Sequence, residues 1–127
     1  MKREIISTPL APSAIGPYSQ GVKIANLVFT AGQIGLDPAT GKLAEGLESQ
    51  TRQIMANLQA ILAKAGSSLD NAIKTTIFLQ DMADFAQVNA IYGQAFTGAP
   101  PARSTVQVAG LPLGALVEIE AVAMIPD

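Results

Sequence analysis

Two segments decide how the fold is interpreted: Gly98-Ala-Pro-Pro-Ala-Arg-Ser-Thr-Val-Gln-Val108 and Val117-Glu-Ile-Glu-Ala-Val-Ala-Met124. Each contains alternating apolar and polar residues, which is typical of a β-strand. Only 14% of the 127 residues are charged, yet Arg103 stands in the first segment and Glu118 and Glu120 in the second. A charge within a strand is costly unless water or a partner satisfies it. These residues are therefore predicted to line an open face or to form a site.

The turn Gly110-Leu-Pro-Leu-Gly114 is expected to join the two strands as a hairpin. Because side chains alternate across a strand, a tight turn places Arg103 and Thr105 opposite Glu120 and Glu118. Two interpretations of this arrangement stay open on spacing alone. One is a cross-strand ion pair worth ~0.2–1 kcal/mol. The other is an arginine that grips a carboxylate beside a glutamate that positions water.

The rest of the chain is predicted to alternate strands and helices, because apolar residues recur with period two or at helical spacing. The expected elements are a short strand or loose arm over 4–7, a hairpin over 21–31 that turns near Ala25-Asn26, a helix over 47–65 ended by Gly66, a strand over 73–79, a helix from Asp81 or Asp84 to about Phe96, and strands over 102–108 and 116–125. This order predicts one α+β domain over residues 1–127, with both helices on one face of a mixed sheet.

The opposite face of that sheet is expected to be open. Thr30, Thr75 or Thr76, Val106 and Ala121 are the residues predicted to close it against a partner.

The chain contains no cysteine and no histidine. This excludes disulfides and thiolate nucleophiles, and it removes the commonest general base and metal ligand, so a glutamate is the natural remaining base. The eight Lys and Arg residues are scattered and the formal net charge is −2, which disfavours nucleic acid as the main substrate. No apolar run reaches the roughly 18–20 residues that span a bilayer, and no export signal is recognised, so a soluble cytoplasmic protein is expected.

Three residues outside the two strands are further candidates. Tyr18 lies on a loop broken by prolines and glycine, where it is either an anchor or the wall of a pocket. Asn89 lies at the edge of the apolar stripe of the second helix, where its amide makes a structural hydrogen bond or contributes to a site. Gly32 follows a strand directly, which marks a bulge or a close backbone approach.

Five segments occur in order along most of the chain: Ile15-Gly-Pro-Tyr-Ser-Gln-Gly21, Thr30-Ala-Gly-Gln-Ile34, Asp84-Phe-Ala-Gln-Val-Asn-Ala-Ile-Tyr92, Pro101-Ala-Arg-Ser-Thr105 and Val117-Glu-Ile-Glu-Ala121. Together they resemble the reactive intermediate deaminase (Rid) family. The resemblance implies a chorismate-mutase-like subunit and a homotrimer with clefts between subunits. It also implies cofactor-free hydrolysis of 2-enamine and 2-imine acids, such as 2-aminoacrylate, to 2-keto acids and ammonia, which removes damaging metabolites.

Site residues follow from the resemblance by position. Arg103 matches the arginine that holds the substrate carboxylate, and Glu118 matches the acid that orients or activates water. Tyr18 and Asn89 match cleft residues contributed partly by a neighbouring subunit. Gly32 matches a position whose backbone faces the substrate.

Two residues depart from the family pattern. Ala31 stands where many members have serine, and Thr105 stands where many have cysteine, so a hydroxyl and a thiol are missing from the expected substrate-binding set. These changes bear on substrate preference and rate more than on reaction type. The alternatives to a deaminase are a trimer that binds small keto acids or amino acids without turnover, and a ribonuclease or translation inhibitor.

Overall fold

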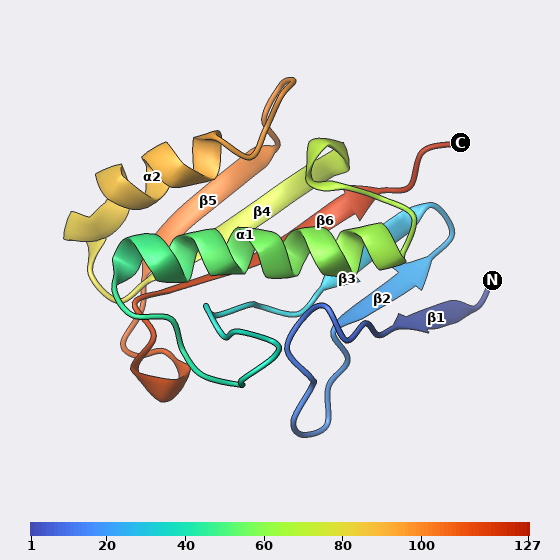
Figure 1. The fold of residues 1–127 in the computed structure, drawn as a ribbon. Helices are drawn as coiled ribbons and strands as arrows, with labels where there is room; N and C mark the ends of the chain where they lie inside the picture. The colour runs from blue at the N-terminus through green and yellow to red at the C-terminus, as the bar shows by residue number, and fades with distance from the viewer.

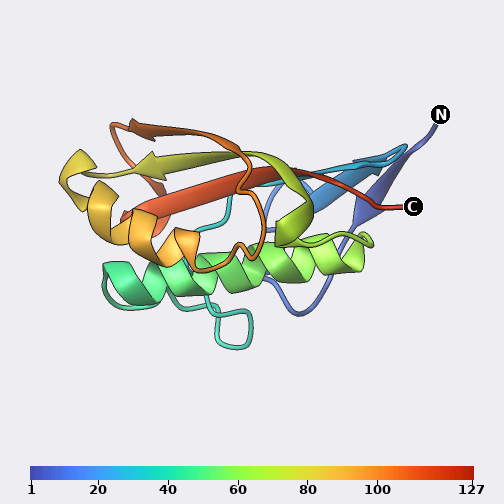
Figure 2. The same ribbon diagram turned by 90° about the horizontal axis from the view of Figure 1, so that it is seen from above.

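Six strands form one mixed sheet in the computed structural model, which describes residues 1–127. The strands are β1 (Arg3–Ile6), β2 (Gly21–Ile24), β3 (Leu27–Thr30), β4 (Ala72–Leu79), β5 (Ala102–Gln107) and β6 (Val117–Met124), in the sheet order β1-β2-β3-β6-β4-β5. Only β4 and β5 are parallel neighbours. The helices α1 (Leu47–Lys64) and α2 (Phe85–Gly93) lie on one face of the sheet, as predicted (Figures 1 and 2).

The local elements of the first half of the chain match the prediction closely. β2 and β3 form the expected hairpin, with Ile24 opposite Leu27 and Ala25 in the left-handed region at φ 52°. α1 ends within a residue of its predicted end, and Gly66 follows at φ 90°, a conformation that glycine adopts without a Cβ clash.

The core lies between α1 and the sheet. Ile54, Leu58, Ile61 and Leu62 share the buried face of α1 and are fully buried, because they recur every three or four residues. They belong to one apolar cluster with strand residues that include Ile77, Ile119 and Val28.

α2 is shorter than predicted. It follows a single 3₁₀ turn, Met82–Asp84, whose N-cap is Asp81, with its Oδ1 accepting from the Ala83 N–H at 2.9 Å. The helix ends at Gly93 rather than near Phe96. The reason is that the chain tightens into 3₁₀-type bonds there, with the Ala95 N–H donating to the Tyr92 carbonyl.

The predicted hairpin between the last two strands is wrong, because β4 lies between β5 and β6. The chain leaves β4 through α2 and returns as β5 parallel to it, a connection that needs a crossover helix. It then passes the end of β4 and runs back as β6 on the other side of that strand. Arg103 is therefore opposite Thr75 of β4, whereas Glu118 is opposite Phe78 of the same strand.

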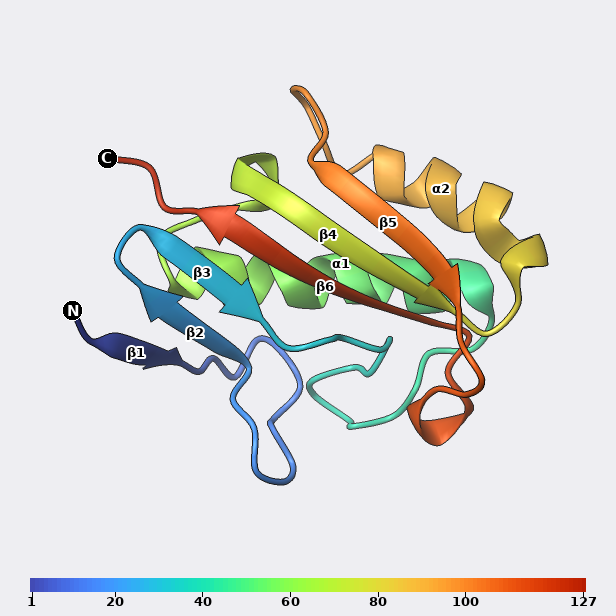
Figure 3. The ribbon, with the colours of Figure 1, turned by 180° about the vertical axis from the view of Figure 1, so that it is seen from behind.

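The face of the sheet away from the helices carries no covering element (Figure 3). Phe29, Val106 and Met124 are each more than two-fifths exposed. The prediction for this face is correct for Thr76 and Val106. Thr76 is opposite Glu120 of β6, and Val106 is opposite Phe78 of β4.

Three residues predicted for the open face are on the other one. Thr75 and Ala121 are 1% and 3% exposed under the helices. Thr30 shares the face of fully buried Val28, and its Oγ1 accepts from the Ala121 N–H at 3.0 Å. Small and β-branched residues carry no strong preference for one face, which explains the error.

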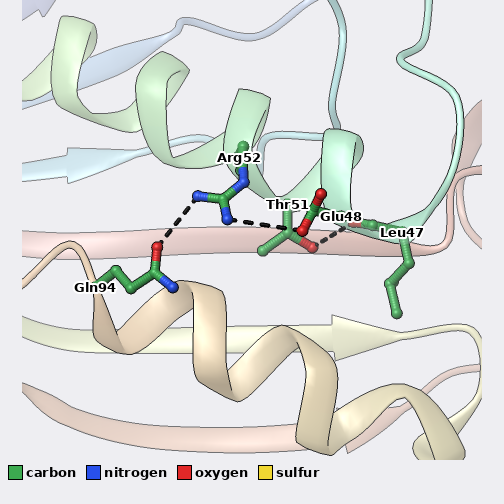
Figure 4. A network of polar contacts seen from close by, with 5 residues as sticks. All are labelled: Leu47, Glu48, Thr51, Arg52 and Gln94. Carbon is green, nitrogen blue, oxygen red and sulfur yellow. Dashed lines mark hydrogen bonds and ion pairs between the residues drawn. The ribbon is translucent and has the colours of Figure 1, made fainter.

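Polar contacts on the outer surface join the two helices (Figure 4). Arg52 of α1 donates from Nη1 to the Gln94 Oε1 at 3.2 Å and lies 3.7 Å from Glu48. Such exposed contacts contribute little to stability. Neither helix has both the length and the apolar character that crossing a bilayer requires.

Candidate functional site

Arg103 projects from β5 towards α2. Its Nη1 donates to the Asn89 Oδ1 at 2.7 Å, and its guanidinium carbon lies 5.3 Å from the ring centroid of Phe85 and 5.1 Å from that of Tyr92. Phe85, Asn89 and Tyr92 stand at i, i+4 and i+7 of α2, so one face of the helix holds the guanidinium. No carboxylate of the chain pairs with Arg103, since the one ion pair joins Arg52 to Glu48.

A cavity of about 430 Å³ opens beside this arginine. Its lining comes from α2, from the loop after it and from the start of β5: Asn89, Tyr92, Gly93, Phe96, Gly98, Pro100, Pro101 and Arg103. A guanidinium has five N–H donors, and the hydrogen bond to Asn89 uses one of them. The remaining donors suit a planar carboxylate.

The loop wall of this cavity is fixed from outside. The Asp70 carboxylate accepts from the Thr97 N–H at 2.9 Å and from the Thr97 hydroxyl at 2.7 Å. The hydroxyl bond is the largest cause that lowers the pKa of Asp70 from its ordinary value. Asp70 thereby holds the start of the segment that carries Gly98 to Pro101.

Glu118 projects from β6 into a second cavity, of about 650 Å³. The lining residues that were predicted for the site are Tyr18, Ala31, Gly32 and Glu118. Glu118 is half-buried and accepts no hydrogen bond from the protein. Burial raises the pKa of its carboxyl, and the neighbouring charge of Glu120 raises it further. A carboxylate with a raised pKa and no cation beside it is suited to accept a proton.

Gly32 gives this carboxylate its space. A Cβ on residue 32 would overlap the Glu118 Oε2 and stand 2.8 Å from its Cδ. The close approach predicted from the sequence is therefore found here, with the Glu118 side chain as the neighbour. The backbone is held in place by Gln33, whose N–H donates to the Ile119 carbonyl at 2.9 Å and whose carbonyl accepts from the Ile119 N–H at 3.1 Å.

Tyr18 belongs to a cavity wall rather than to the core, since it is 53% exposed and lines the Glu118 cavity. Its segment is held by the side chain of Gln20, which is 4% exposed. Gln20 Nε2 donates to the carbonyls of Thr8, Ala11 and Pro12, and its Oε1 accepts from the Thr8 N–H at 2.7 Å. The pocket-wall interpretation of Tyr18 is therefore the one that fits.

The two halves do not meet within one chain. Arg103 and Asn89 lie on the helix-covered face of the sheet, whereas Glu118 projects from the opposite face into a different cavity. The prediction that Arg103 and Glu118 share one small area is therefore wrong for a single chain. Thr105 lines neither cavity; it follows Arg103 on the same face of β5, and its buried Oγ1 has no hydrogen-bond partner.

The sequence-based prediction missed Phe85 and Tyr92 as neighbours of Arg103. Apolar residues at helical spacing in this segment indicate a buried stripe, and the spacing of Phe85 and Tyr92 from Asn89 was the available signal of the site. The chain has no group of three or more acidic, cysteine or histidine residues that could hold a metal ion.

Comparisons with known proteins identify similar chains. The family model described as Endoribonuclease L-PSP matches residues 8–125. The mouse (Mus musculus) 2-iminobutanoate/2-iminopropanoate deaminase is 49% identical over 123 residues, which are 96% of this chain and 91% of that protein. The Arabidopsis thaliana chloroplastic Reactive Intermediate Deaminase A is 51% identical over 124 residues, 97% of this chain and 66% of that protein. A solved Rid-family protein from Yersinia pestis, YyfA, is 48% identical with a TM-score of 0.95, covering 98% of this chain and 100% of that one.

Proposed function

Because the chain belongs to the reactive intermediate deaminase family, also described as Endoribonuclease L-PSP, we propose that it hydrolyses small 2-imino and 2-enamino acids, such as 2-aminoacrylate, to 2-keto acids and ammonia. The observation that carries the proposal is chemical complementarity. Arg103 has free N–H donors beside a cavity, and Glu118 presents a half-buried carboxylate to another cavity, where burial within one chain raises its pKa. A cytoplasmic location, expected from the sequence, is part of the same proposal.

Arg103 binds the substrate carboxylate through two parallel hydrogen bonds and neutralises its charge. The imine nitrogen of such a substrate is already partly protonated in water, so the carbon beside the carboxylate is electrophilic. A 2-enamino acid first takes a proton on carbon and becomes the same imine. The substrate needs no further activation before water attacks.

Glu118 aims a water molecule at the imine carbon and accepts its proton as the new C–O bond forms. The product is a carbinolamine, and the proton taken up by Glu118 passes to its nitrogen. The C–N bond then breaks and releases ammonia, and the hydroxyl group returns its own proton to Glu118 as the carbonyl of the 2-keto acid forms. Each of these steps depends on holding the reactants in place more than on strong acid or base chemistry. No cofactor is required.

We further propose that the site is completed by a second copy of the chain, within a homotrimer. Arg103 and Glu118 lie in cavities on opposite faces of one sheet, so one small substrate reaches both only if they come from different copies. The open face of the sheet supports this. Phe29, Val106 and Met124 are exposed on it and have no partner in one chain.

The function is tested by measuring keto-acid release from 2-aminoacrylate that a second enzyme generates in the same vessel. The wild-type chain should accelerate release, and Arg103→Ala should lose most of that acceleration. Arg52→Ala is the matched control, because it removes an arginine from the outer helix surface. Wild-type rates in Arg103→Ala would refute the assignment. Binding of keto acids without any turnover by the wild type would favour the non-catalytic alternative.

A ribonuclease is the second candidate, because the matching family model carries that description. The net charge of −2 and the scattered Lys and Arg residues weigh against it. RNA cleavage by the purified chain that disappears in Arg103→Ala would support this activity. Cleavage that is unchanged in Arg103→Ala would assign it to a contaminant.

A further inference from the structure

We propose that Phe85 and Tyr92 are positioning residues that form an aromatic cradle for the Arg103 guanidinium and orient it towards a substrate carboxylate. The inference rests on the proposed function, since it concerns how that site binds its substrate. The guanidinium carbon lies over both rings, 5.3 Å and 5.1 Å from their centroids. Both distances are within the roughly 6 Å over which a ring face attracts a cation.

The cradle holds the cation without neutralising it. An aspartate or glutamate beside Arg103 would occupy the same N–H donors that a substrate carboxylate needs. A ring face instead contacts the flat face of the guanidinium and leaves the in-plane donors at its edge free. Asn89 occupies one of these donors through a neutral amide oxygen at 2.7 Å. The result is a fixed and still positively charged fork beside the 430 Å³ cavity.

Tyr92 is itself anchored to the strand beside Arg103. It is 3% exposed, and its hydroxyl shares a 2.6 Å hydrogen bond with the Thr75 hydroxyl. Thr75 is the residue of β4 directly opposite Arg103, so cradle and cation are fixed to neighbouring positions of the sheet. Phe96 packs against the Tyr92 ring at 4.8 Å between centroids. Burial also raises the pKa of Tyr92, so this hydroxyl stays neutral and keeps its hydrogen bond to Thr75.

Preorganisation of this kind predicts a specific kinetic effect. A loose guanidinium must be ordered each time a carboxylate binds, and this ordering weakens binding. Replacing either ring by leucine keeps apolar bulk but removes the ring face. The Michaelis constant should then rise about 2- to 30-fold, the range expected for a cation–ring contact. The turnover number should change little, because Glu118 acts from a different element.

The experiment compares Tyr92→Leu, Phe85→Leu and Tyr92→Phe with the wild type. The probes are 2-oxobutanoate and its primary amide, 2-oxobutanamide, with dissociation constants measured by calorimetry beside KM and kcat. Both leucine variants should weaken binding of the carboxylate and leave binding of the amide unchanged. Tyr92→Phe keeps the ring, so it should bind the carboxylate within a few-fold of the wild type. The small loss of carboxylate affinity in Tyr92→Phe then measures how much the hydrogen bond of the Tyr92 hydroxyl contributes to anchoring the ring.

Three outcomes overturn the cradle. The first is wild-type affinity for 2-oxobutanoate in both leucine variants. The second is an equal loss for the carboxylate and the amide, which indicates a merely structural role. The third is a loss in Tyr92→Phe as large as in Tyr92→Leu. Should Tyr92→Leu fail to fold, half-buried Phe85 carries the test. The proposed function is judged separately by wild-type turnover. If the wild type is active and Phe85→Leu binds 2-oxobutanoate as tightly as the wild type does, the cradle alone is refuted.

Discussion

Replacing Gly32 with alanine should remove catalysis while leaving the fold intact. The new Cβ would stand 2.8 Å from the Glu118 Cδ and would overlap its Oε2, whereas ordinary contact begins at 3.4 Å. The carboxylate must therefore retreat by roughly 1 Å, and a misplacement of that size costs about 10²-fold in rate. The backbone of residue 32 has no positive φ, so the substitution adds no conformational strain.

The assay for Gly32→Ala is the initial rate of keto-acid release over a range of substrate concentrations. The loss should fall on kcat, because Arg103 still binds the carboxylate in its own cavity. Gly110→Ala is the matched control, since a Cβ there meets open space at an unstrained φ. A wild-type kcat in Gly32→Ala would refute the reasoning, because Glu118 could then move without consequence.

Four further predictions concern ionisation and stability. The kcat/KM profile should have an acidic limb that follows the ionisation of Glu118, because the base must be ionised to accept a proton; a profile without an acidic limb would contradict its role. Burial raises the pKa of the Glu118 carboxyl within one chain and so favours its protonated form. Stability is therefore lost as pH rises through this folded-state pKa, and Glu118→Gln should have a higher melting temperature than the wild type only above that pH. Gln20→Leu should lower the free energy of unfolding by about 2–4 kcal/mol in a urea titration, because four hydrogen bonds are lost. Leu58→Ala should lower it by about 2–5 kcal/mol, because the side chain is fully buried, and a smaller loss would mean that the core refills the space.

The sequence predicted those features of the fold that depend on neighbouring residues. The apolar period over 47–65 placed α1 almost to the residue, because a helix buries one face and the period records it. The turn at Ala25-Asn26 and the stop at Gly66 were predicted from single residues whose backbone preferences are local.

The order of strands in the sheet was not predicted for β5 and β6, because it depends on which strand inserts between two others. The alternation of apolar and polar residues along β5 and β6 is the same whether or not β4 lies between these two strands. The usable signal was the helix between β4 and β5, since a strand–helix–strand order favours a parallel pair. Applied consistently, it would have paired β5 with β4 rather than with β6.

Six of the seven candidate residues line a cavity, but their division between two separate cavities was not predicted. Tyr18, Ala31, Gly32 and Glu118 line one cavity, and Arg103 and Asn89 line another. Charge and residue type identify such groups from the sequence, but the face on which each projects depends on the strand order.

The most direct test of the central claim is a mixing experiment with two inactive variants, Arg103→Ala and Glu118→Gln. Each variant keeps the residue that the other lacks. If every site combines Arg103 of one copy with Glu118 of the next, random reassembly of equal amounts restores about one quarter of the sites in a cyclic trimer. We therefore expect keto-acid release at roughly 25% of the wild-type rate after the mixture is unfolded and refolded together. A refolded mixture no more active than the separate variants, from a preparation in which refolded wild type regains full activity, would contradict the account.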